Sequence, residues 1–294
     1  MENITKDDFA KWTLEKTGFW GGDIGDNNKR SIWICGIEEG GEYDGEKSCL
    51  DKRIKEDLDN IDNLGIGYEN SEDSCYMNSI SLDKGVFKLI NAIQGCELSK
   101  YNDYKKLPCK PFVKNDKKGF FKMNLFPVAC GSLSKWNSHV QEVTGFSCKE
   151  LYREWCRGNL GNCGKSRFDL IREWVNDNKP KLVICFGRGN KEDFKSVFFL
   201  NDSNVACCTE QICKRNLEIY FNMDRNMMVV ICPFPTYRGG YSLSPNNDAL
   251  IQSFGERIRS EFKKLFPNGD SGECEDKDCC LRSECIFNNN TLKS

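Results

Sequence analysis

Four short apolar runs, each ending abruptly in Gly, Pro or polar residues, constrain the fold of this chain more than any other feature. Such a run is typical of a buried parallel strand whose carboxyl end opens into a loop. Several stretches between the runs carry apolar residues at helical spacing. This alternation predicts an α/β fold, a three-layer α/β/α sandwich around a central, mainly parallel, four-stranded sheet. The four runs lie at residues 31–36, 120–125, 182–186 and 227–232.

Two further elements are predicted from apolar spacing. The first is an added strand over Asn216–Asn222, which reads NLEIYFN. The second is an amphipathic helix near the start of the chain, ending at Gly18 or Gly21. Its apolar face would be formed by Phe9, Trp12, Leu14 and Phe19.

Length and charge limit the domain organisation and the partners. The chain has 294 residues and a formal net charge of -2, and no linker rich in Pro, Gly or Ser divides it. We therefore expect one domain over residues 1–267 and a polar, Cys-rich tail over 268–294. The near-neutral balance argues against a uniformly basic nucleic-acid-binding protein. Lys100–Lys122 nevertheless carries eight lysines against two aspartates, and this segment could hold phosphates or form a solvated loop.

Cysteine content bears on the compartment and on metals. Eighteen cysteines would favour disulfides in a small secreted chain, but this chain is large and starts without the pattern of a signal peptide. No apolar run of about 18 residues is present, so we expect no membrane span and a cytoplasmic protein. We expect that no cofactor is required. Weak candidates for zinc or an iron–sulfur cluster are Cys274, Cys279, Cys280 and Cys285, and also Cys148, Cys156, Cys163, Cys207, Cys208 and Cys213.

The loop after the first apolar run has the residue types of a reactive site. It reads GIEEGG and contains two adjacent carboxylates, Glu38 and Glu39. A carboxylate at a strand end can act as a general base or stabilise a cation, and glycines let a ligand approach the backbone. On these residues alone, exposed turn carboxylates are the alternative interpretation.

The order of the segments resembles the uracil-DNA glycosylase superfamily. In that family a strand ends in a loop such as GINPG, a later strand ends in an Asn that hydrogen-bonds the flipped base, and a last strand ends in HPSP or MPSSSAR. Here Gly36–Gly40 falls on the first loop, Asn124 on the base-reading Asn and Cys232–Arg238 on the last motif. The PKLVICFG segment at 180–187 is similar to the family's penultimate strand, so the resemblance spans 32–243.

The resemblance implies a DNA glycosylase that flips a base and hydrolyses its glycosidic bond. Glu38 and Glu39 would be catalytic, with Glu38 steadying the sugar cation and orienting water. Asn124 would select the base, Tyr43 would cover it, and Tyr237 or Arg238 would wedge into the vacated stack. Substrate contacts would come from Gly36, Ile37, Gly40, Tyr43, Asn124, Cys232 and Phe234. DNA contacts would come from Pro233, Pro235, Thr236, Tyr237, Arg238 and Arg188.

Departures from the family pattern shape the expected substrate. Cys232 replaces the His that often assists departure of the base, and Glu39 stands where Pro is usual. Together with the space left by Gly40 and Gly41, these changes favour a modified base over uracil, with modified phage DNA as one version. We expect a monomer that acts on DNA. The one histidine, His139, matches no family slot and is interpreted as a surface or capping residue.

Two alternatives from other classes stay open. A protein of the same fold could bind DNA or a nucleotide without cleaving it, which would fit the missing His and the acidic total charge. A metal-dependent nucleotide or nucleoside hydrolase would fit acidic loops after strands.

Overall fold

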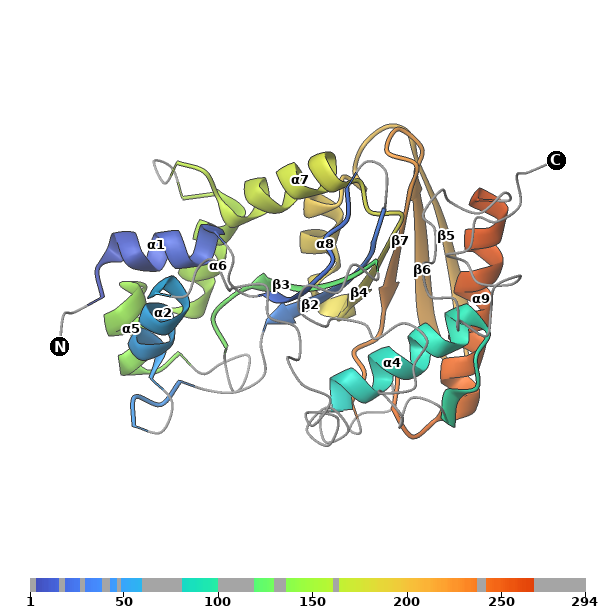
Figure 1. Cartoon of the computed structure of the whole chain (residues 1–294), viewed down its shortest axis with the longest axis horizontal. Coiled ribbons are helices and arrows are strands. Elements are labelled where there is room, and N and C mark those ends of the chain that lie inside the picture. The colour runs from blue at the N-terminus through green and yellow to red at the C-terminus, as the bar shows by residue number, and fades with distance from the viewer. Residues whose placement is uncertain are drawn as a thin grey trace.

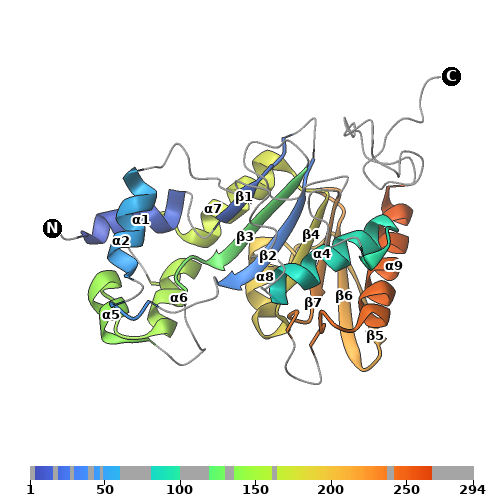
Figure 2. The ribbon, with the colours of Figure 1, turned by 60° about the horizontal axis from the view of Figure 1, so that its bottom comes forward.

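The computed structural model shows a mixed α/β architecture with one sheet and helices on both of its faces (Figures 1 and 2). The strand order across the seven-stranded sheet is β1-β3-β2-β4-β7-β6-β5. The general α/β class is therefore confirmed. The structure describes residues 4–15, 19–26, 30–38, 43–46, 49–59, 81–99, 119–129, 136–160, 164–236 and 242–266.

The four expected strands form the parallel centre of the sheet. They are β3 (Phe120–Phe126), β2 (Ile32–Glu38), β4 (Leu182–Phe186) and β7 (Met227–Cys232), paired in that order. Their side chains are almost all buried, because helices cover both faces, which explains the continuous apolar runs.

Three antiparallel strands flank this centre, so the described part of the sheet has seven strands and not four. The expected added strand is confirmed as β6 (Arg215–Asn222), which pairs with β7. Next to it lies β5 (Val205–Ile212), which the sequence did not reveal because exposed and half-buried residues alternate along it without a buried face. On the opposite edge, β1 (Phe19–Gly22) pairs with β3.

The first helix is shorter than expected. Helix α1 (Lys6–Glu15) buries Phe9 and Trp12 as predicted, but Phe19 lies in β1 and not on the helix. Pairing with β3 decides the conformation of the FWGG segment, and tertiary pairing of this kind overrides local spacing.

Two helices cover one face of the sheet. They are α4 (Ser81–Gln94) and α9 (Asp248–Leu265). The two helices pack so closely that a Cβ at Gly255 would collide with Ala92. Ile32 and Ile34 of β2 point into the core on this side. This core is called the α4/α9 face below.

The remaining helices lie on the other side of the sheet, and some of them are grouped beside the strands and not over them (Figures 1 and 2). Trp33 and Cys35 of β2 point into the core on this side, so alternate residues of one strand serve two layers. Helices therefore lie on both sides of the sheet, as the general α/β class implies. The helices are α1, α2 (Leu50–Asp59), α5 (Ser138–Thr144), α6 (Lys149–Arg157), α7 (Arg167–Asn178) and α8 (Lys191–Val197), the last preceded by the 3-10 turn η5 (Arg188–Asn190).

The described residues up to Phe266 are organised around this one sheet, and the expected tail at 268–294 lies outside them. Within the described ranges, none of the helices has both the length and the apolar character that crossing a membrane requires.

Candidate functional site

The carboxyl ends of the four parallel strands meet at one edge of the sheet. Glu38 at the end of β2 pairs with Phe126 of β3, and Phe186 of β4 pairs with Cys232 of β7. Ligands of open α/β sheets bind at this edge. The fold therefore gathers the strand ends on which the sequence placed its site residues.

Gly36 and Asn124 are direct neighbours at this edge. They pair across β2 and β3, and a Cβ at Gly36 would collide with the side-chain oxygen of Asn124. The missing side chain of Gly36 is thus what lets the Asn124 amide lie against β2. Asn124 is flanked by Met123 and Leu125, whose side chains enter the opposite core, so its amide points to the α4/α9 face.

The Asn124 side chain is largely buried, and its amide has no hydrogen-bond partner among the described residues. Only 2% of the residue is exposed, and the side-chain amide makes no hydrogen bond within the described ranges. Buried amides are nearly always paired with protein, water or ligand. This amide therefore keeps both a donor and an acceptor available at the strand edge.

The backbone of Asn124 is fixed by a buried arginine. Arg167 of α7 is fully buried and donates one hydrogen bond to the Asn124 carbonyl at 3.1 Å and another to the Thr13 carbonyl at 3.0 Å. Burial lowers the pKa of Arg167 to about 10, so it is still charged at neutral pH. Sequence reasoning missed this residue. Its one local signal is the capping box of Ser166 and Asp169, which marks the helix start and not the buried guanidinium.

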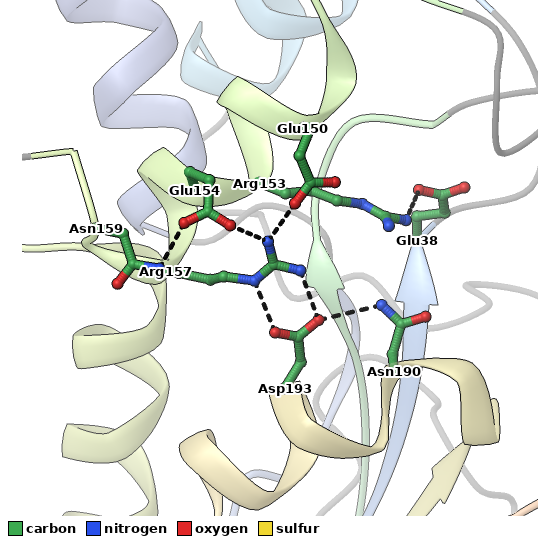
Figure 3. Close-up of polar contacts among 8 residues, drawn as sticks. All are labelled: Glu38, Glu150, Arg153, Glu154, Arg157, Asn159, Asn190 and Asp193. Carbon is green, nitrogen blue, oxygen red and sulfur yellow. Dashed lines mark hydrogen bonds and ion pairs between the residues drawn. The ribbon is translucent and has the colours of Figure 1, made fainter.

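Glu38 is held by two cations of α6. Lys149 Nζ lies 2.8 Å from Oε1 of Glu38, and Arg153 Nη2 lies 3.3 Å from Oε2 (the Arg153 contact is drawn in Figure 3). The Glu38 side chain is 14% exposed, so it points to α6 and not to bulk solvent. Sequence reasoning missed Lys149 and Arg153, although their four-residue spacing places them on one helix face.

The same helix is tied to the segment that follows β4. Arg157 binds both carboxylate oxygens of Asp193, at 2.8 and 3.0 Å, and Asn190 donates to Asp193 at 3.2 Å (Figure 3). Arg157 also binds Glu150 and Glu154. Helix α6 is thus anchored at one end on Glu38 and at the other on α8.

Three strand ends converge around Gly187. Its φ of 119° is a glycine conformation, and a Cβ there would collide with Ile37 and lie 4.0 Å from Phe234. Its N–H donates to the carbonyl of Cys232 at 3.0 Å. The structure therefore brings together the predicted residues Ile37 and Phe234, and Phe234 is 38% exposed.

Part of the last motif, Cys232–Arg238, is buried in the core. Cys232 is fully buried on the α4/α9 face, and burial raises the pKa of its thiol, so the thiol is neutral at pH 7. Pro233 is buried, Pro235 packs against Gly85 of α4, and the Thr236 carbonyl accepts from Ser242. The predicted Tyr237 and Arg238 lie outside the described residues, as do Glu39 and Gly40.

Two other predicted contacts are engaged elsewhere. Tyr43 is 7% exposed and packs in the core opposite the α4/α9 face, which differs from the expectation that its ring covers a base. Arg188 is 41% exposed and lies 3.5 Å from the buried carboxylate of Glu218, which also binds Lys191 at 2.7 Å.

His139 was interpreted from the sequence as a surface or capping residue, and the structure shows that it caps a helix. Its Nε2 accepts the N–H of Leu50, the first residue of α2, at 3.0 Å. This contact satisfies one of the open N–H groups at the start of that helix.

The described residues contain no group of three or more His, Cys, Asp or Glu side chains that could hold a metal ion. Burial raises the pKa of Cys156 to about 12, which makes it a poor metal ligand, whereas Cys148, Cys207 and Cys213 are exposed. The candidates that lie outside the described residues are Cys163, Cys274, Cys279, Cys280 and Cys285.

No model of a known protein family matches the chain, and a search of curated proteins finds no match. What the fold and the site define is a mixed α/β protein with polar groups at the carboxyl edge of its parallel strands. The likeness to the uracil-DNA glycosylase superfamily stays a prediction from Gly36–Glu38, Asn124 and the segment that begins at Cys232.

Proposed function

We propose that the protein is a DNA glycosylase that flips a modified base out of DNA and hydrolyses its glycosidic bond. The observation that carries the proposal is the side-chain amide of Asn124, which lies at the carboxyl edge of the sheet and makes no hydrogen bond to another described residue. An amide offers a donor and an acceptor side by side, which suits the edge of a flipped base.

Glu38 is the proposed catalytic carboxylate. It lies two residues beyond Gly36 on β2, at the same edge of the sheet as Asn124, with its carboxylate held toward α6 while the Asn124 amide points to the α4/α9 face. Positive charge develops on the sugar as the glycosidic bond breaks, and an ionised carboxylate can stabilise that charge and orient the attacking water.

Cys232 bears on which base departs. Its neutral, fully buried thiol cannot act as a protonated His would, so the departing base must be stabilised by hydrogen bonds such as those of Asn124. A modified base is therefore a better candidate than uracil, and modified phage DNA would make this a defence enzyme. We take it to act as a cytoplasmic monomer with a glycosylase-like fold.

The test is a panel of duplex and single-stranded DNAs that carry different modified bases. Free bases are measured by mass spectrometry and abasic sites by alkaline cleavage. We expect release of one class of base, unaffected by chelator, and a loss of about 100-fold or more in Asn124→Asp, because the aspartate lacks the amide donor. Asn91→Asp is the matched control, since Asn91 of α4 is also buried but its amide donates to the carbonyl of Glu97. Activity that disappears in chelator would favour the metal-dependent hydrolase.

A second candidate is a protein that binds modified DNA without cleaving it. The specific observation in its favour is that Lys149 and Arg153 occupy both carboxylate oxygens of Glu38. Tight binding to one modified DNA with no base released would select this candidate.

A further inference from the structure

The contact of Glu38 with two cations is more than charge neutralisation requires. The side chains of Lys149, Arg153 and Glu38 are 8%, 11% and 14% exposed, and together they carry a net charge of +1. One cation would balance the carboxylate, and burying a second charge adds a desolvation cost. The arrangement is therefore not explained by stability alone.

The two cations fix the orientation of the carboxylate. Lys149 contacts Oε1 at 2.8 Å and Arg153 contacts Oε2 at 3.3 Å, so neither oxygen can turn away without losing a partner. A carboxylate with one partner could rotate about its last bond. Two partners on different oxygens define one orientation.

The cations are themselves held in place. The guanidinium of Arg153 lies 4.9 Å from the ring centroid of Phe126, the residue that pairs with Glu38 across β2 and β3. One turn further along α6, the bidentate contact of Arg157 with Asp193 fixes the helix to α8 (Figure 3). The frame thus runs from the end of β2 to the segment after β4.

We propose that Lys149 and Arg153 are positioning residues that hold the Glu38 carboxylate in its working orientation. This inference rests on the role proposed above for Glu38. Two cations near a sugar that becomes positive would by their charge alone oppose the reaction. Their benefit must therefore come from geometry, and this fixes the sign of the effect: removing either cation slows base release.

The experiment measures single-turnover base release and DNA affinity separately in the full chain. We expect Lys149→Met and Arg153→Met each to lower the rate by about 10- to 100-fold, as small misplacements of a reacting group do. The dissociation constant for the modified DNA should stay within about twofold. Lys149→Arg and Arg153→Lys should recover most of the rate, because each retains a donor at the same helix position.

Matched controls come from α7. Lys165 forms an exposed pair with Glu173, and Arg172 binds Asp169 and Ser196. Lys165→Met and Arg172→Met should leave the rate and the affinity unchanged. Melting temperatures of all variants show which ones are folded at the assay temperature, and the conservative variants keep the test decisive if a Met variant unfolds.

The outcomes separate this inference from the function on which it rests. An active wild type with unchanged rates in the Met variants would overturn the positioning role alone. Weaker DNA binding with an unchanged rate would also overturn it, because Lys149 and Arg153 would then be phosphate ligands. A wild type that releases no base from any DNA would overturn the proposed function and this inference together.

Discussion

For individual residues, the site depends on the close approach of a glycine and an amide. Gly36 leaves room for the Asn124 side chain, and any larger residue would displace it. The sequence placed both residues in the site by their order along the chain. It could not show that they pair, because 88 positions separate them and pairing is decided by the sheet.

Gly36→Ala tests this pairing. The added methyl group would collide with the Asn124 oxygen, so we expect a loss of about 1 to 3 kcal/mol in the free energy of unfolding, measured in denaturant. Base release should fall as well, since the amide is displaced. Gly189→Ala is the control, because nothing lies within 4 Å of its new methyl group and its effect should stay within about 0.5 kcal/mol. Equal losses in both variants would contradict the proposed packing.

Glu218 makes a pH-dependent contribution to stability. Burial acts to raise the pKa of this carboxyl, but the hydrogen bonds from Lys191 and Tyr220 outweigh it and lower the pKa. A lowered folded-state pKa means that the stabilisation is present above the unfolded value of about 4.3 and is lost as pH falls through the folded pKa.

Glu218→Gln should therefore cost about 1 to 3 kcal/mol at pH 7 and much less at the acid end of the titration. Denaturant unfolding of both proteins between neutral and acid pH measures the difference. A cost that is the same at every pH would contradict the argument. Glu192→Gln is a matched control, since Glu192 is exposed and pairs weakly with Lys195 at 3.4 Å.

At the scale of the element, α6 carries the part of the site that the sequence did not reveal. The contacts of Glu38 with Lys149 and Arg153 span 111 and 115 positions. No local pattern encodes such a distance, whereas the apolar runs of the strands are local and were predicted correctly. Two strands were missed for a related reason: β1 has four residues and β5 buries no face, so each depends on its neighbour more than on its own sequence.

Helix α2 provides a test of capping by a histidine. His139 of α5 accepts the Leu50 N–H at 3.0 Å, so His139→Ala should cost about 1 kcal/mol of folding stability. Thermal and denaturant unfolding would measure it, with Glu142→Ala on the exposed side of α5 as the control. The capping role is wrong if both variants unfold alike.

At the scale of the whole molecule, four parallel strands carry the candidate site and three antiparallel strands extend the sheet. The parallel centre was predictable because helices bury both faces, which leaves a continuous apolar run in each strand. The position of Tyr43 was not predictable, because an aromatic residue near a strand end can either pack in the core or cover the edge of the sheet. In this structure Tyr43 packs in the core. Function follows from the residues at the edge and not from the fold, so it has to be tested there.

The proposed reaction is hydrolytic removal of a base with Glu38 as the catalytic carboxylate. The most direct measurement is mass spectrometry of the DNA product after reaction in oxygen-18 water. We expect the label to enter the abasic sugar with release of an intact base, and we expect Glu38→Gln to lower the rate by about 100-fold or more. Intact DNA with the wild-type protein, or an undiminished rate in Glu38→Gln, would contradict the proposed reaction.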